Sequence, residues 1–147
     1  DVLKQLQSTP DHFDLLIMHA GANDILGFTP RKKLEKEALL LLDEVKAKAD
    51  HVVFLTAGNV GKVPFFPKPI GWIFTYKTKQ VRELLKGEAE KRNILYVDLF
   101  TSRHDRTFNA DVTKYHAKDL IHLTNEGYKV WYDDIVKKLS DSGISVP

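Results

Sequence analysis

The stretch FDLLIMHAGAND, residues 13–24, decides the fold of this chain. Its first eight residues are apolar except for Asp14 and His19, and polar and apolar positions do not alternate cleanly along it. A short continuous apolar run of this kind is typical of a strand that is covered on both faces, as strands of a parallel sheet are. Gly21 then allows a tight turn directly after the strand.

Two further apolar runs, HVVFLTA (51–57) and NILYVDLF (93–100), have the same character. Between and after these runs, apolar residues recur at helical spacing and predict helices over about 31–50, over about 76–92 and after Thr124. Strands that alternate with helices indicate an α/β protein with right-handed crossovers. We therefore expect a single α/β domain over residues 1–147, with helices on both faces of a parallel sheet.

Three strands make a thin sheet, and a strand as apolar as 13–20 needs a neighbour on each side. The chain also begins at Asp1 and has its one methionine at position 18. These observations predict that the chain is a processed product or a fragment, and that one or more strands precede residue 1.

Composition excludes several classes of function. The formal net charge is +2, with both signs interspersed as in RKKLEKE (31–37), so no basic stripe predicts nucleic-acid binding. No apolar run is long enough to cross a bilayer. Because cysteine is absent, disulfides, thiolate nucleophiles and cysteine-bound zinc are excluded. A cytoplasmic location is favoured, and export is left open.

Candidate functional residues follow the three predicted strands. Ligands of open α/β sheets bind at the carboxyl ends of the strands, where all three following loops begin. Asn23, Asn59 and His122 lie in these loops and are expected to converge although they are far apart in the sequence.

The tetrapeptide GAND (21–24) follows the first strand directly. After the turn at Gly21, the carboxamide of Asn23 can present its N–H groups to the cleft, and Asp24 can accept hydrogen bonds from loop amides. An ordinary turn explains such a string equally well when it stands alone.

The tetrapeptide DLIH places Asp119 three residues before His122. On a turn, this spacing lets the carboxylate meet the Nδ1–H group of the histidine, which leaves Nε2 to act as a base. The alternative is a surface Asp–His pair in front of a helix that Thr124 caps, and the two interpretations are compatible.

Together, GAND and DLIHLTNEGY (119–128) resemble two sequence blocks of the SGNH (GDSL-type) hydrolases, a family of esterases and acyl hydrolases. The resemblance implies a flavodoxin-like three-layer α/β/α fold and no cofactor. It implies that Asn23 is an oxyanion-hole donor, that Asp119 orients the histidine and that His122 is the general base. Gly21 and Asp24 would support the turn that carries Asn23.

The family also has a Gly-Asp-Ser turn with the nucleophile and a second glycine block, and both precede the Asn block. Here only DVLKQLQSTPDH (1–12) precedes the first strand, and Ser8 has no strand before it. The resemblance therefore implies that residues 1–147 are the C-terminal two-thirds or more of a hydrolase domain. An N-terminal segment would carry the serine, and this chain alone would be inactive.

The resemblance implies ester substrates, either small-molecule esters or acylated glycans, and leaves open hydrolysis or acyl transfer. In the stretch VPFFPKPIGWIFTY (63–76), Phe65, Phe66 and Trp72 are candidates to line an acyl pocket or to form a mobile flap. The same aromatic residues can instead close the core. Asn59 is a candidate substrate contact, with a role in a turn as the alternative.

Two alternatives do not use a serine. His116, Asp119 and His122 recur at three-residue intervals, with His104, Asp105 and Asp111 nearby, and could hold a metal ion in a metal-dependent hydrolase. The chain could also be a non-catalytic α/β binding module.

Overall fold

The computed structural model describes residues 2–144. The strands β1 (Phe13–Ala20), β2 (Ala49–Thr56) and β3 (Leu95–Val97) form one parallel sheet in the order β1-β2-β3. Each strand coincides with or overlaps one of the three apolar runs, with β2 beginning two residues before the run 51–57, so the predicted α/β class is confirmed. The strand β3 is shorter than the run 93–100 because only three of its residues pair with β2.

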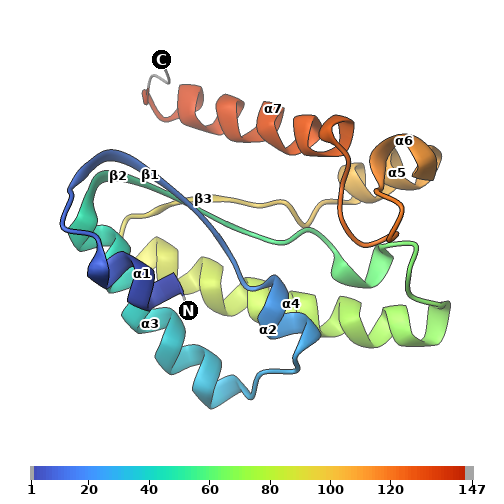
Figure 1. The fold of residues 1–147 in the computed structure, drawn as a ribbon, viewed down its shortest axis with the longest axis horizontal. Helices are drawn as coiled ribbons and strands as arrows, with labels where there is room; N and C mark the ends of the chain where they lie inside the picture. Colours follow the sequence, from blue (N-terminus) through green and yellow to red (C-terminus); the bar gives the residue numbers. More distant parts are fainter. Residues whose placement is uncertain (1, 145–147) are drawn as a thin grey trace.

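Helices fill the connections and cover both faces of the sheet. Figure 1 shows α3 and α4 below the sheet and α7 above it. In the described residues, no helix combines the length and the apolar character needed to cross a membrane. In chain order the helices are α1 (Val2–Ser8), α2 (Ala22–Leu26), α3 (Arg31–Lys48), the 3₁₀ helix η1 (Val60–Lys62), α4 (Lys68–Lys91), α5 (Ser102–Ala110), α6 (Val112–Tyr115) and α7 (Asn125–Asp141).

Two hydrophobic clusters hold these layers together. Successive side chains of a strand point to opposite faces, so β2 contributes Phe54 to the cluster below the sheet, where α3 and α4 pack. Its residues Val53 and Leu55 join the cluster on the other face, which α7 closes with Leu139. Because both faces of β2 are covered, its sequence is a continuous apolar run rather than an alternating one.

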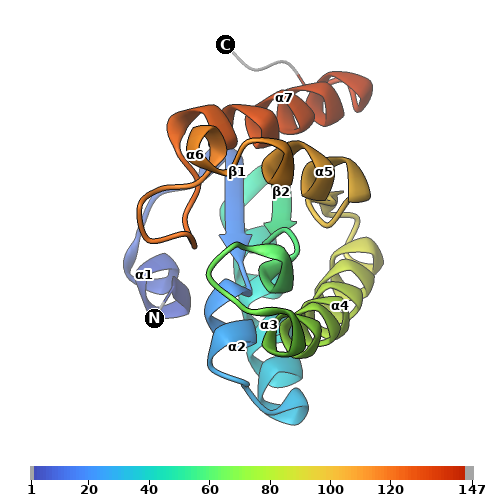
Figure 2. The same cartoon turned by 90° about the vertical axis from the view of Figure 1, so that its right-hand side faces the viewer.

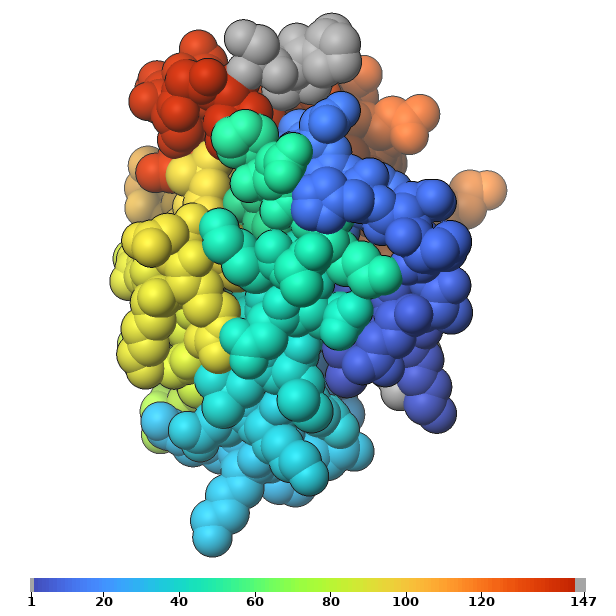
Figure 3. All heavy atoms as spheres, turned by 90° about the vertical axis from the view of Figure 1, so that its left-hand side faces the viewer, coloured from blue at the N-terminus to red at the C-terminus, as the bar shows by residue number. Residues whose placement is uncertain are grey.

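The strand β1 lies at the border of the sheet. Figure 2 shows it beside β2 on the side of α1, and Figure 3 shows the blue N-terminal residues along one flank of the molecule. Within residues 2–144, no strand pairs with its outer edge, and Ile17 is 50% exposed. The strand that reads as central is thus an edge strand here, and its outer edge is open to a further strand.

Helix α4 begins at Lys68, well before the start predicted near residue 76. Pro67 is its N-cap, and Pro69 lies in its first turn. Backbone N–H groups of a first turn have no partner within the helix, so the N–H group that proline lacks is not missed there. Phe66 stacks on Phe74 with ring centroids 4.3 Å apart, and both contact the core below the sheet. Residues 68–76 of the stretch 63–76 are thus the first part of α4, and residues 63–67 form the turn that leads into it.

Two glycines let η1 lie against α4. A Cβ atom on Gly61 would lie 2.0 Å from the carbonyl oxygen of Gly71 and 2.4 Å from the backbone nitrogen of Thr75. Both contacts are far inside van der Waals distance, and both are with backbone atoms that cannot turn away. Gly61 thereby fixes the segment after β2 to α4.

We expect Gly61→Ala to lower the free energy of unfolding of the full-length protein by about 3 kcal/mol, because η1 must separate from α4 to admit the methyl group. Chemical denaturation measures this change. Gly87→Ala is the matched control, since no atom lies within 4 Å of its Cβ position and alanine favours a helix over glycine by about 1 kcal/mol. Equal stability of the two variants would contradict the close contact.

Candidate active site

The carboxyl ends of the strands meet at one edge of the sheet. Ala20 at the end of β1 pairs with Thr56 at the end of β2, so the segments after both strands begin side by side. In Figure 1, α2, η1 and the α5–α6 segment gather at this end of the molecule. A cavity of about 170 Å³ lies between them, and Asn23, Asn59 and His122 all line it. The structure thus brings together the three loop residues that the sequence placed at this edge.

His122 is held by its own carboxylate. The Nδ1–H group of His122 donates to Oδ2 of Asp119 at 2.7 Å. The other carboxylate oxygen, Oδ1, accepts from the backbone N–H groups of Ile121 and His122, each at 2.9 Å. The carboxylate therefore binds both the ring and the backbone of the histidine and fixes the orientation of the ring. Nε2 is the ring nitrogen that Asp119 leaves unbound.

Asp119 is ionised in this arrangement. The hydrogen bond from His122, followed by the two backbone N–H groups, lowers the pKa of Asp119 to about 2. A carboxylate that stays charged near neutral pH can stabilise an imidazolium each time the ring takes up a proton. The pair therefore has the electrostatics of a general base and its orienting acid.

The loop that carries this pair is tied at several points. The backbone N–H of Ala117 donates to the carbonyl of His122 at 2.8 Å, and His116 pairs with Leu123 in an antiparallel bridge. Leu120, between the acid and the base, has φ +60°, a conformation that costs energy for a branched residue. Such backbone strain persists only where the surrounding bonds enforce it, and it is concentrated at functional sites.

Thr124 caps α7, as predicted. Its side chain accepts from the backbone N–H of Gly127 at 3.3 Å, so the cap and the Asp–His pair coexist. A Cβ atom on Gly127 would lie 2.5 Å from the carbonyl oxygen of Tyr115. The first turn of α7 therefore lies directly against the segment before the loop that carries Asp119 and His122.

Gly21 produces the turn that presents Asn23. Its φ is +101°, in the left-handed region that favours glycine, and it is the N-cap of α2. Asn23 is the second residue of that helix and is exposed, and its carboxamide makes no hydrogen bond within residues 2–144. Asp24 is partly buried in the same helix; its side chain makes no hydrogen bond within residues 2–144, and its backbone carbonyl accepts from the N–H of Thr29 at 3.0 Å.

Asn59 is fixed by two neighbours at the other end of the cavity. Its Oδ1 accepts from the hydroxyl of Thr75 at 3.0 Å, and its Nδ2 donates to Oδ2 of Asp105 at 3.3 Å. Burial raises the pKa of Asp105, and the bond from Asn59 and the charge of Lys62 oppose that rise only in part. Asn59 thus supports a carboxylate in the cavity, and its backbone carbonyl also closes the turn of η1 by accepting from the N–H of Lys62 at 2.9 Å.

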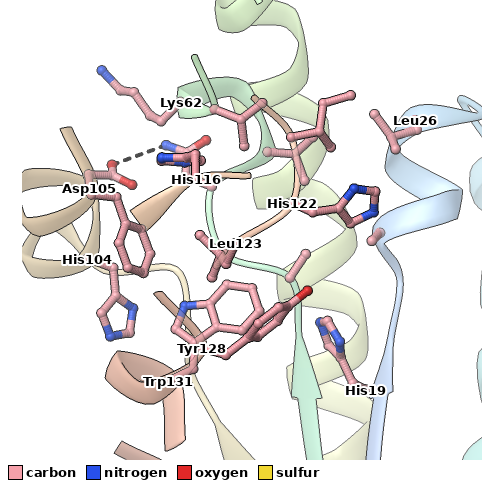
Figure 4. Close-up of a pocket in the computed structure, with 18 of the residues that line it drawn as sticks. His19, Leu26, Lys62, His104, Asp105, His116, His122, Leu123, Tyr128 and Trp131 are labelled. Atoms are coloured by element: carbon pink, nitrogen blue, oxygen red, sulfur yellow. Dashed lines mark hydrogen bonds between the residues drawn. The ribbon is translucent and has the colours of Figure 1, made fainter. Parts of the chain in front are cut away.

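Aromatic side chains from α7 and β1 form one wall of the cavity (Figure 4). The Trp131 ring meets that of His19 edge-on with centroids 5.7 Å apart, and it lies against Gly58, where a Cβ atom would be 3.2 Å away. Burial lowers the pKa of His19. The helical spacing of Tyr128 and Trp131 suggested core residues, and only their position in the first two turns of α7 hinted at the cavity.

Three predicted substrate contacts lie elsewhere. Phe65, Phe66 and Trp72 do not line this cavity. Phe66 packs on the core, whereas Phe65 and Trp72 are 55% and 69% exposed. Phe65 and Phe66 lie in the turn before α4, and Trp72 lies in the first part of that helix.

The metal alternative is not supported by the geometry. Among residues 2–144, no three His, Asp or Glu side chains are grouped so that they could share an ion. Asp119 is already bonded to the ring of His122, and His116 is buried beside Phe108 instead.

No serine within residues 2–144 lines the cavity. Ser8 lies in α1, Ser102 begins α5, and Ser140 and Ser142 lie at the end of α7. The geometry so far comprises an oriented base, a free carboxamide donor and a cavity between them.

Comparison with solved structures supports the fold. The whole chain superimposes on a mutant of an acetyl-xylooligosaccharide esterase from Geobacillus stearothermophilus with a TM-score of 0.59 and 18% identity, and covers 66% of that chain. A second structure, of an acetylxylan esterase from the same organism, gives a TM-score of 0.57 and 19% identity over 95% of this chain and 62% of the other. The chain thus spans less than two-thirds of the length of these structures.

Sequence comparison gives the family. No curated protein matches the chain. Residues 1–130, most of the chain and including both GAND and DLIH, match the GDSL-like lipase/acylhydrolase family. The predicted resemblance is therefore confirmed, and the chain belongs to the GDSL-like lipase/acylhydrolase family.

Proposed function

We propose that the full-length protein hydrolyses carboxylic esters through a Ser-His-Asp mechanism in which His122 is the general base. The observation that carries the proposal is the position of His122 and Asn23 on one cavity, with Nδ1 of the histidine bound to Asp119. Residues a hundred positions apart thereby supply an oriented base and an unpaired N–H donor at one place. Acyl transfer from an ester needs both groups.

Each group has a defined step. His122 takes the proton of a serine hydroxyl as its oxygen attacks the ester carbonyl, and Asp119 stabilises the imidazolium. The carboxamide of Asn23 donates to the oxyanion that forms on the former carbonyl oxygen. His122 then returns the proton to the leaving alcohol. Water repeats the sequence on the acyl-enzyme and releases the acid.

The serine is assigned to a segment N-terminal to these residues. The outer edge of β1 is open to a strand, and a strand there would end at the same edge of the sheet as Gly21 and Asn23. The side chains of His122 and Asp119 are 69% and 48% exposed, which also suits a site that a further segment covers. Residues 1–147 are then the C-terminal part of the hydrolase domain and are inactive alone.

A fluorophosphonate probe tests the assignment, because it reacts with an activated serine. We expect stoichiometric labelling of the full-length protein at one serine N-terminal to residue 1, with loss of labelling in His122→Ala. Labelling within residues 2–144 would contradict the placement of the nucleophile. Absence of labelling, together with an intact fold, would favour a non-catalytic binding module.

A further inference from the structure

Helix α4 carries exposed apolar side chains on the outward face of its first turns. Trp72, Ile73 and Tyr76 are 69%, 54% and 65% exposed, and the residues that α4 buries lie on the opposite face. Farther along the outward face, Glu83 and Glu90 follow Tyr76 at seven-residue intervals and are exposed, as charged residues of a solvated helix are. The first turns of α4 therefore differ from the rest of the helix.

Exposed phenylalanine rings extend this apolar face beyond the helix. Phe28, which follows α2, is half exposed, and its ring centroid lies 5.2 Å from that of Phe74 in α4. Phe66 stacks on the same Phe74 ring, and Phe65 meets Phe66 edge-on at 5.2 Å. These contacts join the exposed rings to the start of α4. We define the α4 patch as the exposed residues Phe28, Phe65, Ile70, Trp72, Ile73 and Tyr76.

The stretch of chain that carries most of the α4 patch is basic. Residues 61–81 contain Lys62, Lys68, Lys77 and Lys79 and neither aspartate nor glutamate. Because the formal net charge of the chain is +2, the remainder of the chain is net acidic. Among residues 2–144, the lysines that pair with a carboxylate lie outside this stretch. The positive charge beside the α4 patch is therefore uncompensated by its neighbours.

This composition fits an anionic lipid surface better than a protein partner. The cores of protein interfaces are depleted in lysine and enriched in arginine and methionine, whereas residues 61–81 contain lysine and neither of the other two. Tryptophan and tyrosine are enriched at the boundary between membrane and water. Lysine can lay its apolar stem along such a boundary and keep its amine in water. Helices that lie on membranes combine these residue types in the same way.

The α4 patch borders the cavity that contains His122. The backbone N–H of Phe65 donates to the carbonyl of Leu120 at 3.3 Å, and Leu120 is itself partly exposed. Leu26, two residues before Phe28, lines the cavity on the same side as His122 (Figure 4). Figure 1 shows that α4 begins beyond the strands at this end of the molecule, which Figure 2 views directly. A surface bound to the α4 patch would therefore lie beside the cavity.

We propose that the α4 patch binds the protein peripherally to a membrane surface that contains anionic lipids. The aromatic and aliphatic side chains enter the boundary region of the membrane, and the lysines bind lipid phosphate groups. The α4 patch contains none of the residues assigned to ester hydrolysis. Lipid binding therefore goes beyond the proposed function and does not depend on it.

Co-sedimentation of the full-length protein with vesicles measures this binding. We expect the protein to bind vesicles of equal parts phosphatidylglycerol and phosphatidylcholine at least about tenfold more tightly than vesicles of phosphatidylcholine alone. Added salt should weaken the binding, because it screens the attraction between exposed charges. Failure to sediment with either kind of vesicle, or equal binding to both, would overturn the proposal.

Trp72→Ser tests the apolar part of the α4 patch. The variant should bind the anionic vesicles at least about tenfold more weakly, because it removes a large ring that the membrane would bury. Tyr132→Ser is the matched control, since Tyr132 is also an exposed aromatic residue but lies on α7, across the sheet from α4 (Figure 1). Both variants should keep the stability of the unaltered protein. Equal binding by the two variants would contradict the role of the α4 patch.

A double variant tests the lysines. Replacement of Lys68 and Lys79 by glutamine should weaken binding by about 10- to 30-fold. Replacement of Lys46 and Lys91 by glutamine removes the same charge near the ends of α3 and α4, at the opposite edge of the sheet, and should have an effect within about twofold. Equal losses in the two double variants would show attraction by net charge alone and would refute this site.

A second copy of the chain is the competing occupant of the α4 patch. Sedimentation velocity distinguishes it, because a dimer of the unaltered protein that Trp72→Ser converts to a monomer would make the patch an interface between copies and overturn the lipid proposal. His122→Ala should bind the vesicles as tightly as the unaltered protein does. If that variant also retained ester hydrolysis, the proposed function would fail while the membrane site would stand.

Discussion

Replacing His122 with alanine in the full-length protein should lower kcat for ester hydrolysis by roughly 10⁴- to 10⁶-fold. Without the imidazole, no group receives the serine proton, and Asp119 has lost the ring that it orients. KM should change little, since the histidine contributes to the transition state rather than to binding of the ester. Steady-state kinetics with a soluble acetyl ester measures both constants.

A second histidine provides the control for this variant. His12 also pairs with a carboxylate, with Nε2 3.0 Å from Oδ1 of Asp50, and this pair is exposed where β1 and β2 begin. His12→Ala therefore removes the same kind of surface pair from the opposite edge of the sheet and should retain full activity. Retained hydrolysis in His122→Ala would refute the assignment of the base.

Replacing Asn23 with alanine should lower kcat by roughly 10²- to 10³-fold, with a modest change in KM. The carboxamide donates to an oxygen that becomes fully charged only in the transition state, so its loss affects the rate more than ground-state binding. Because the side chain is exposed and makes no hydrogen bond within residues 2–144, its removal should leave the free energy of unfolding nearly unchanged. Kinetics and denaturation on one preparation separate the two effects.

Asn125 is the matched position for this variant. It is exposed at the first position of α7, outside the cavity. Asn125→Ala removes an equivalent carboxamide and should keep kcat within a factor of about two, as surface substitutions do. Equal rates for Asn23→Ala and the unaltered protein would remove Asn23 from the oxyanion hole.

The sequence predicted the sheet and the convergence of the loops for a physical reason. Continuous apolar runs form where a strand is covered on both faces, and parallel strands direct the following loops to one edge. Those two rules suffice to bring Asn23 and His122 to one cavity. The hydrogen bond between Asp119 and His122 could also be predicted from the sequence, because their three-residue spacing on a turn brings the carboxylate to Nδ1 of the ring.

What the sequence did not predict depends on contacts between distant residues. Helix α4 starts at Lys68, and its first part packs directly on Gly61, where a side chain would collide with the backbone of Gly71. No local sequence pattern predicts that these two segments are in contact. Trp131 reads as a core residue because it lies on the apolar stripe of α7. Whether such a residue closes a core or lines a cavity depends on what faces it, here Gly58 and His19.

The unpaired border of β1 has a consequence for handling the protein. Free backbone N–H and C=O groups on an apolar edge strand recruit any extended chain that can complete the ladder. If residues 1–147 were produced without a covering strand, copies of the chain would compete for that position through Ile17 and its neighbours. Self-association that increases with concentration is then the expected behaviour of the isolated piece, and supplying the covering segment in trans should suppress it.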